Sequence, residues 1–207
     1  MEMSKKENIY LYGAGGHAKV IIDILKENDI FVAEIIDDNK DLTSLLEIPI
    51  ISTFKTDKPI IVSIGDNLIR KKIADKFDGV PFSKAIAKSA IISELAEIGD
   101  GSVVMQGSII QSSVKIGKHV IVNTGATIDH DCTIGDFVHI APGSNLCGNI
   151  EVGDGSLIGA GVIIIPGIKI GKWSVIGAGS VVTRNIPDNV IAFGSPCRMI
   201  RNKQQMY

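Results

Sequence analysis

The sequence predicts an α/β domain followed by a parallel β-helix built from hexapeptide repeats. Two observations carry the β-helix. A branched aliphatic residue recurs at every sixth position, and the residue two places before it is always small or β-branched. A period of six fits neither an α-helix nor a half-buried strand, but it fits a chain that turns after each short strand. The third observation is a glycine-rich turn between two apolar segments near the N-terminus, which predicts the α/β domain.

The front domain is expected to begin with a strand over 9–12 and a helix over 19–27. The turn between them reads Gly13-Ala-Gly-Gly-His-Ala18. Glycines let the backbone approach a ligand closely, and free amides at the start of a helix favour phosphate. The turn therefore predicts a phosphate-binding loop, with a tight turn that binds nothing as the structural alternative.

Two further strands are predicted over 31–36 and 60–64, and a helix over 68–77 follows the second of them. Strands that alternate with helices pair in parallel, so their carboxyl ends meet at one edge of the sheet. Asp37 lies at such an end, where it can accept hydrogen bonds from a ribose or a base. Residues 1–83 are therefore expected to form half of a Rossmann fold, which suits one nucleotide rather than a dinucleotide.

The hexapeptide repeat fills most of the second domain, predicted over residues 84–207. It runs without a slip in register, and Ile86 is already in phase. No inserted loop interrupts the coils to form a lid, so a second substrate would have to be held by the front domain. The repeating aliphatic residues are Ile92, Ile98, Val104, Ile110, Ile116, Val122, Ile128, Ile134, Ile140, Leu146, Val152, Ile158, Ile164, Ile170, Ile176 and Val182.

Composition narrows the range of partners. A net charge of −2 over 207 residues gives no basic surface for nucleic acid. No apolar run is long enough to span a membrane, and the segment Met1–Asn8 is charged, unlike a signal peptide. The three cysteines are odd in number and scattered, which indicates free thiols in a reducing compartment. We therefore expect a cytoplasmic protein with no nucleic-acid or membrane partner.

His130 is the candidate for acid–base chemistry. It lies between Asp129 and Asp131 at an expected turn of the β-helix. A neighbouring carboxylate orients an imidazole and stabilises its charged form, which suits a general base working near neutral pH. The spacing does not decide which of the two aspartates contacts the ring, and an ordinary surface histidine is the alternative.

Two other histidines lie in the repeat region. His139 follows His130 by half a coil, and His119 has no acidic neighbour and is expected to face solvent. Some β-helices bind zinc through three histidines shared between subunits. A metal-binding or non-catalytic β-helix that uses His119, His130 and His139 is therefore kept as an alternative.

Several motifs together indicate a family. They are Tyr10-Leu-Tyr-Gly-Ala-Gly-Gly-His17, Ile36-Asp-Asp38, Ser63-Ile-Gly-Asp-Asn-Leu-Ile-Arg-Lys-Lys72, Asn123-Thr124 with Ile128-Asp-His-Asp-Cys132, and Gly194-Ser-Pro196. In these motifs the chain resembles bacterial sugar acyltransferases of the NeuD/PglD type over nearly its whole length. The resemblance implies a left-handed β-helix, a homotrimer with sites at subunit interfaces, and acetyl-CoA bound between neighbouring β-helices, without a metal.

The resemblance also implies roles for individual residues. His130 corresponds to the base and Asp131 to its helper, which is one methylene shorter than the glutamate of the bacillosamine-pathway enzymes. The nucleotide-sugar contacts fall on Gly15, Gly16, His17, Asp37, Asp38, Gly65 and Asn123. The acetyl-CoA contacts fall on His139 and on the backbones of Ala160 and Ala178.

The expected function is acetyl transfer from acetyl-CoA to the 4-amino group of a UDP- or GDP-linked amino-deoxy sugar in bacterial glycan biosynthesis. An O-acetyltransferase that acts on sialic acid or another sugar hydroxyl is the alternative. The residues do not separate these two activities, and they do not distinguish uridine from guanosine.

Overall fold

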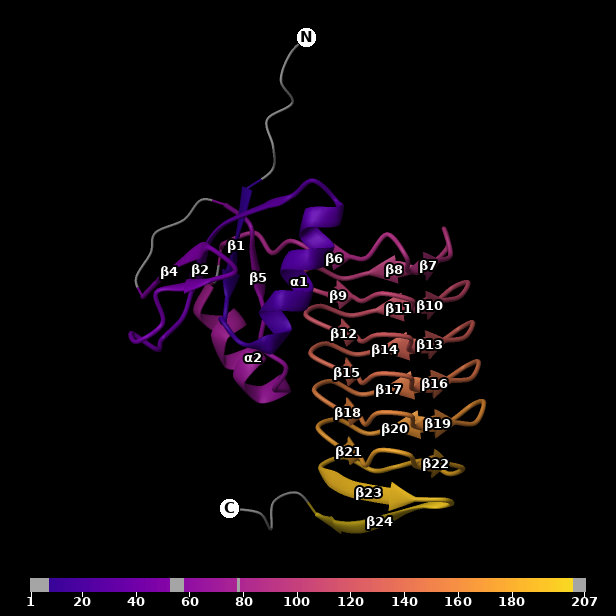
Figure 1. The fold of residues 1–207 in the computed structure, drawn as a ribbon. Helices are drawn as coiled ribbons and strands as arrows, with labels where there is room; N and C mark the ends of the chain where they lie inside the picture. Colours follow the sequence, from indigo (N-terminus) through magenta and orange to yellow (C-terminus); the bar gives the residue numbers. More distant parts are fainter. Residues whose placement is uncertain (1–7, 53–57, 78, 203–207) are drawn as a thin grey trace.

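In the computed structural model, which describes residues 8–52, 58–77 and 79–202, an α/β domain packs beside one end of a three-faced column (Figure 1). Residues 1–7, most of the charged segment that argues against a signal peptide, lie outside the described part. Within the described part, no helix is long and apolar enough to cross a bilayer.

The front sheet has the order β3-β4-β2-β1-β5, and β1 pairs in parallel with both β2 and β5. The predicted parallel sheet is thus confirmed. The third predicted strand stops at Val62 rather than at residue 64. The strands are β1 (Asn8–Tyr12), β2 (Phe31–Ile36), β3 (Ser44–Leu45), β4 (Ile48–Ile51) and β5 (Ile60–Val62).

Both predicted helices are present, with shifted ends. Helix α1 (Gly16–Glu27) begins three residues before the predicted start, because the glycine turn itself closes its first turn. Helix α2 (Asn67–Ala74) is capped by Asp66, whose carboxylate accepts a hydrogen bond from the Ile69 amide at 2.8 Å. A 3₁₀ turn, η1 (Asp75–Phe77), completes the segment predicted as helix.

The short antiparallel pair β3–β4 was not predicted. Strand β4 also pairs in parallel with the end of β2, so it extends the sheet on that side. Each strand is too short to show an alternating pattern, and Pro49 within β4 argues against a strand. The apolar run of Ile48, Ile50 and Ile51 is the signal that could have revealed it.

The column confirms the predicted hexapeptide-repeat β-helix, because β-strands of two residues recur every six residues without interruption. They stack in parallel as three sheets. The face beside the front domain, here called the docked face, contains β6 (Ala85–Ile86), β9 (Val103–Val104), β12 (Ile121–Val122), β15 (His139–Ile140), β18 (Leu157–Ile158) and β21 (Val175–Ile176).

The other two faces differ in the residues that point outward. The aliphatic face contains β7 (Ile91–Ile92), β10 (Ile109–Ile110), β13 (Thr127–Ile128), β16 (Asn145–Leu146), β19 (Ile163–Ile164) and β22 (Val181–Val182). The charged face contains β8 (Glu97–Ile98), β11 (Lys115–Ile116), β14 (Thr133–Ile134), β17 (Glu151–Val152) and β20 (Lys169–Ile170). Strands β23 (Val190–Gly194) and β24 (Cys197–Asn202) close the column as an antiparallel pair.

The interior of the column holds the repeating aliphatic residues and the small residues two places before them. Buried serines occur among the small residues because their hydroxyls donate to carbonyls about one coil away. Ser144 donates to the Gly159 carbonyl at 2.8 Å, and Ser156 donates to the Gly171 carbonyl at 2.6 Å. A buried hydroxyl with such a partner carries little desolvation cost. The three cysteines form no disulfide, as predicted.

The front domain is fixed to the docked face by apolar contacts on both sides of its sheet. Residues of α1 share one buried cluster with Val103, Met105 and Ile121 of the column. On the other side, the cluster that includes Phe77 packs against Phe137. The glycine turn of the front domain and the column therefore hold a defined relative position.

Candidate active site

The carboxyl ends of β1, β2 and β5 meet at one edge of the front sheet and enclose a cavity of about 420 Å³. This is the edge where parallel α/β sheets bind ligands. The cavity brings together all six residues that the sequence predicted for this domain, namely Gly15, Gly16, His17, Asp37, Asp38 and Gly65.

The glycine turn is shaped by its neighbours. Gly13 has φ +106°, and a Cβ there would lie 2.9 Å from Ile64 Cγ1, so this position requires glycine. The buried Ser63 hydroxyl donates to the carbonyls of Tyr12 and Gly13 at 2.9 and 2.6 Å. These contacts tie the end of β1 to the end of β5 beneath the cavity.

Gly15 and Gly16 have a different reason to be glycine. Neither has positive φ, and a Cβ at either position would meet nothing within 4 Å. The missing side chains leave the start of α1 open to the cavity, and no acidic residue lies in the first turn. Open amides at a helix N-terminus form a site for an anion such as phosphate.

The two aspartates after β2 make different contacts. Asp37 accepts from the Ala14 amide at 2.7 Å and from the Asn39 amide at 2.9 Å, so both of its oxygens hold the surrounding backbone. Asp38 is exposed and pairs with the Tyr12 hydroxyl. Burial, with Asp38 as the second cause, raises the pKa of Tyr12 above its usual range. Asp38 is thus the carboxylate with more free acceptor capacity toward the cavity.

His17 completes the wall of the cavity. Its Nε2 atom is buried without a hydrogen-bond partner among the described residues. Burial, together with nearby His139 and Arg70, lowers the pKa of His17 to about 4. The ring is therefore neutral at physiological pH, and its unpaired nitrogen is available to a ligand.

His139 lies on the docked face in a second cavity of about 690 Å³, which shares Gly65 and Ile69 with the first. The amide of Asn123 contacts His139 Nε2 at 3.1 Å. Burial and the charge of Arg70 lower the pKa of His139 to about 4. Two neutral imidazoles, His17 and His139, thus lie on either side of the shared wall.

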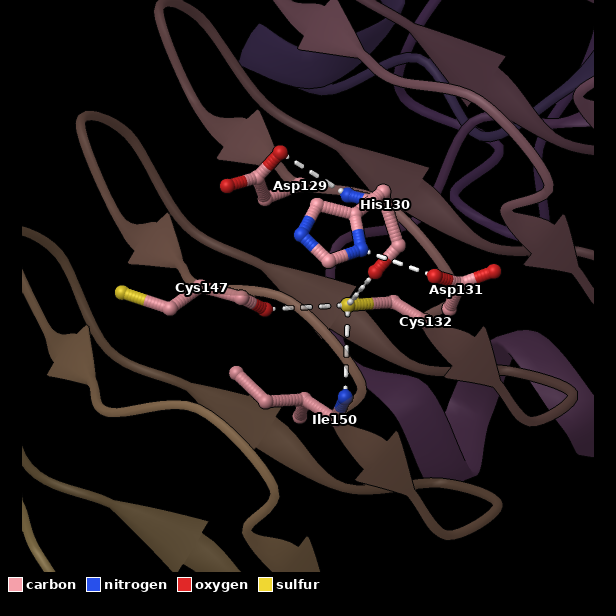
Figure 2. Close-up of polar contacts among 6 residues, drawn as sticks. All are labelled: Asp129, His130, Asp131, Cys132, Cys147 and Ile150. Atoms are coloured by element: carbon pink, nitrogen blue, oxygen red, sulfur yellow. Dashed lines mark hydrogen bonds and ion pairs between the residues drawn. The ribbon is translucent and has the colours of Figure 1, made fainter.

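His130 has the opposite surroundings. Its Nδ1 atom lies 2.8 Å from Asp131 Oδ2, whereas Asp129 accepts from the His130 backbone amide at 2.9 Å (Figure 2). Asp131 is therefore the aspartate that contacts the ring. The side chain is 59% exposed, and its pKa is raised, first by the hydrogen bond to Asp131 and then by the charge of Asp129.

Gly148 supports the His130 ring from the next coil. A Cβ at Gly148 would lie 2.5 Å from His130 Cε1 and 2.6 Å from Nε2. Gly148 does not have positive φ, so the ring, rather than the backbone conformation, requires glycine here. This contact fixes the height of the imidazole above the corner of the column.

His130 lies away from the cavities of its own chain. The chain passes from the docked face through Thr124-Gly125 to the aliphatic face, and then turns at His130-Asp131 onto the charged face. The His130 corner is therefore the one opposite the docked face. Ala160 and Ala178 are exposed at the corner between the docked and aliphatic faces, so the structure brings them together with each other but not with His130.

The expectation that His119 faces solvent is wrong. His119 is 5% exposed, because it stacks on Phe137 at 4.9 Å and meets Phe82 edge-on at 4.4 Å. Burial lowers its pKa to about 4. The zinc alternative therefore loses one of its three proposed ligands, because Phe82 and Phe137 enclose this ring. Among the described residues, no three histidine, cysteine or carboxylate side chains gather where they could hold a metal.

Two residues of interest were not singled out from the sequence. Gly148 follows His130 by one coil, so the repeat period could have identified it. Arg70 lies on the same face of α2 as Ile73 and Ala74, the i+3 and i+4 positions, and it is buried with them. Helical spacing could therefore have predicted that this cation is buried.

Together, the column and the pocket at the edge of the front sheet define a hexapeptide-repeat protein with a mononucleotide-type pocket. Two family models match the chain, the PglD N-terminal domain over residues 8–77 and the bacterial transferase hexapeptide over residues 131–165 and 149–184.

Solved structures extend the similarity to almost the whole chain. A variant of perosamine N-acetyltransferase from Caulobacter crescentus, in complex with CoA and GDP-perosamine, is 35% identical with a TM-score of 0.90, covering 94% of this chain and 97% of that one. The acetyltransferase domain of PglB from Neisseria gonorrhoeae FA1090, in complex with acetyl coenzyme A, is 34% identical with a TM-score of 0.88, covering 94% and 100%. The chain belongs to the hexapeptide-repeat acyltransferases that carry a PglD N-terminal domain.

Curated sequences match over shorter segments. UDP-N-acetylbacillosamine N-acetyltransferase of Bacillus subtilis (strain 168) is 38% identical over 119 residues, which cover 48% of this chain and 51% of that protein. A second relative, the uncharacterized protein L142 of Acanthamoeba polyphaga mimivirus, is 38% identical over 101 residues, 46% of this chain and 21% of that protein. The chain thus spans about half or less of these relatives.

Proposed function

We propose that the protein is an acetyl-CoA-dependent N-acetyltransferase that acts on the 4-amino group of a nucleotide-linked amino-deoxy sugar, UDP- or GDP-linked. The observation that carries the proposal is the pocket that gathers Gly15, Gly16, His17 and Asp38, in a fold that matches a GDP-perosamine- and CoA-bound enzyme over 94% of the chain. The open start of α1 suits the diphosphate, and Asp38 suits a ribose or base.

In this proposal His130 is the general base. A carboxylate only accepts hydrogen bonds, so Asp131 keeps a proton on Nδ1 of His130 and leaves Nε2 as the acceptor. Nε2 takes the proton of the sugar amine as the amine nitrogen attacks the thioester carbonyl. The carbon–sulfur bond then breaks, and the proton passes to the leaving thiolate. Acetyl-CoA supplies the activated acetyl group.

The remaining residues bind rather than react. His139 is neutral and held by Asn123, so we assign it to the acetyl donor, together with the exposed backbones at Ala160 and Ala178. Asn123 also faces the acceptor sugar in this assignment. Holding both substrates side by side removes much of the entropy cost of their encounter.

We further propose a homotrimer in which His130 of one chain serves the nucleotide pocket of a neighbour. The support is geometric, because His130 occupies the corner opposite the face that carries its own front domain. The aliphatic face offers the contact surface, since Ile91 is 65% exposed and Ile163 is 43% exposed. The charged face, with Glu151 and Lys169 paired at 2.8 Å, suits solvent.

The test is acetyl transfer measured as thiol release from acetyl-CoA, with UDP- and GDP-linked 4-amino sugars and free sialic acid as acceptors. We expect turnover with one nucleotide-linked amine and a fall of about 10²-fold or more in His130→Ala. Turnover with free sialic acid alone would favour the O-acetyltransferase alternative. Near-wild-type turnover in His130→Ala would reject the base assignment.

A further inference from the structure

Arg70 is a buried cation without an ion-pair partner among the described residues. It is 1% exposed, although it extends from α2, a short helix at the domain junction. All of its hydrogen-bond acceptors are neutral, and Asp66 acts on it only at a distance. A charge buried in this way is costly unless every donor is satisfied, so the partners of the guanidinium group decide whether Arg70 can be accommodated here.

The guanidinium bonds two parts of the molecule at once. On the front-domain side, Nη1 donates to the carbonyls of Ile64 and Gly65 at 2.9 and 3.0 Å. On the column side, Nε donates to the His119 carbonyl at 2.9 Å and Nη2 donates to the Phe137 carbonyl at 2.9 Å. The planar fork therefore joins the loop after β5 to a corner of the column.

Asn67 continues the same connection. Its Oδ1 accepts from Arg70 Nη2 at 2.9 Å, while its Nδ2 donates to the carbonyls of Gly155 and Ser156 at 3.1 Å each. Arg70 and Asn67 together, here called the junction pair, tie three successive coils of the column to one loop of the front domain. That loop contains Gly65.

Gly65 belongs to the wall shared by the nucleotide-type pocket and the second cavity, which contains His139. Phe137 and Val138, whose carbonyls accept from Arg70, immediately precede His139. The junction pair thus spans the short path between the pocket edge and the neighbouring histidine. Apolar clusters already hold the two domains together. These hydrogen bonds therefore fix the relative position of the two domains rather than supply the energy that joins them.

We propose that Arg70, with Asn67, is a positioning residue that fixes the Gly65 edge of the nucleotide-type pocket on the column, so that a bound acceptor is delivered at a set height. The inference rests on the proposed function for its catalytic consequence. In that reaction, a displacement of about 1 Å would cost about 10²-fold in rate without removing the pocket itself. The charge of Arg70 also helps to keep His17 and His139 neutral.

The main variant is Asn67→Asp. Its carboxylate still accepts from Arg70, but it turns the two contacts with Gly155 and Ser156 into oxygen–oxygen repulsion. The matched control is Lys72→Gln, which changes the net charge equally on the exposed side of the same helix. Arg70→Lys is the second variant, because it keeps the charge but loses the planar fork.

Amide hydrogen exchange of the assembled protein provides the readout that does not depend on activity. We expect protection of residues 64–70 to fall at least tenfold in Asn67→Asp and Arg70→Lys, with the coils from β13 to β20 unchanged, and wild-type protection in Lys72→Gln. Wild-type protection in Asn67→Asp and in a folded Arg70→Lys would overturn the proposal. If Arg70→Lys does not fold, the Asn67→Asp result decides.

Measurements of kcat and of nucleotide affinity then distinguish a positioning role from a purely structural role of the junction pair. We expect kcat to fall more than tenfold in Asn67→Asp, while the Kd for whichever of UDP or GDP binds wild-type protein changes less than threefold. An unchanged kcat would overturn the positioning role. If the wild type transfers no acetyl group to any acceptor, the proposed function fails, and hydrogen exchange still decides whether the junction pair holds the pocket edge.

Discussion

The four histidines of the chain have the same side chain but four different environments. His17, His119 and His139 are largely removed from water, which disfavours the charged ring and lowers each pKa to about 4. His130 is exposed beside two carboxylates, which favour the charged ring and raise its pKa. Of the four, His130 alone has a raised pKa and a carboxylate on its Nδ1 atom, which leaves Nε2 to accept a proton, as a general base requires.

The first residue-scale prediction concerns pH. A base must be unprotonated, so kcat should rise with pH through the raised pKa of His130, whereas His17 and His139 are neutral throughout this range. Asp131→Asn removes the main cause of the raised pKa, so the acid limb should move to lower pH. The amide can also donate to Nδ1 and place the proton on Nε2, so the plateau should fall about tenfold or more. A pH profile of kcat with an unmoved acid limb would contradict the Asp131 assignment.

The second residue-scale prediction concerns Gly148→Ala. The new methyl group would overlap the His130 ring, which is the free end of a side chain and can swing away at little cost to the fold. We expect the melting temperature to stay within a few degrees while kcat falls about 10- to 100-fold. Ser112→Ala, at the same corner one coil earlier, serves as the control for thermal unfolding and kinetics. Equal kcat in both variants would count against a supporting role for Gly148.

At the scale of elements, the strands of the column and the helices of the front domain depend on different local features. In the column, a two-residue strand is stable because each coil pairs with its neighbours above and below, and the interior aliphatic residues stack in register. In the front domain, the two helices differ in how the amides at their N-termini are satisfied. Helix α1 starts with glycines that leave its amides open, whereas α2 starts with the side-chain cap of Asp66.

This contrast predicts the effect of Gly16→Ala on α1. Alanine lowers the entropy of the unfolded chain and meets no internal contact, so the free energy of unfolding should rise by about 0.4–1 kcal/mol or stay level. The methyl group would stand where we propose that the diphosphate binds, so affinity for UDP or GDP should fall about tenfold, or about 1.4 kcal/mol. Thermal unfolding and titration calorimetry measure the two effects. Loss of both stability and binding would indicate packing instead.

At the scale of the whole molecule, one chain carries all the groups of the proposed reaction but holds them on different sides. The nucleotide-type pocket and His139 lie at the docked face, and His130 lies at the opposite corner. A column without loops cannot bend to join them, because its coils are fixed by continuous backbone pairing. In the proposed reaction, the His130 imidazole therefore reaches the pocket from a second copy of the chain.

The whole-molecule prediction uses Ile163→Glu. Ile163 points outward from β19 and is 43% exposed, so a charge there should leave the isolated chain folded. In the proposed trimer it would be buried without a partner, so we expect monomers in light scattering and at least a 10²-fold loss of turnover. Thr133→Glu, on the charged face, should remain trimeric and active. A fully active Ile163→Glu monomer would contradict the shared site.

The column could be predicted from the sequence because its pattern is local. Each coil repeats the spacing of the coil before it, so reading every sixth residue identifies the interior from Val104 to Val182. The parallel front sheet followed from strand–helix alternation. The pair β3–β4 was missed because its two- and four-residue strands carry no period, and the enclosed His119 was missed because Phe82 approaches it from a distant part of the chain.

By itself, the sequence determined the hexapeptide register, the glycine turn and the histidine between two aspartates, since these depend on neighbours within one coil or one turn. Only the tertiary structure decided that Asp131 contacts the His130 ring, that Gly148 supports that ring, and that Arg70 joins the front domain to the column. These contacts unite residues brought together by the turn at a corner, by the stacking of coils or by the docking of domains. The spacing along the chain places such residues near one another but does not specify which of their atoms make contact.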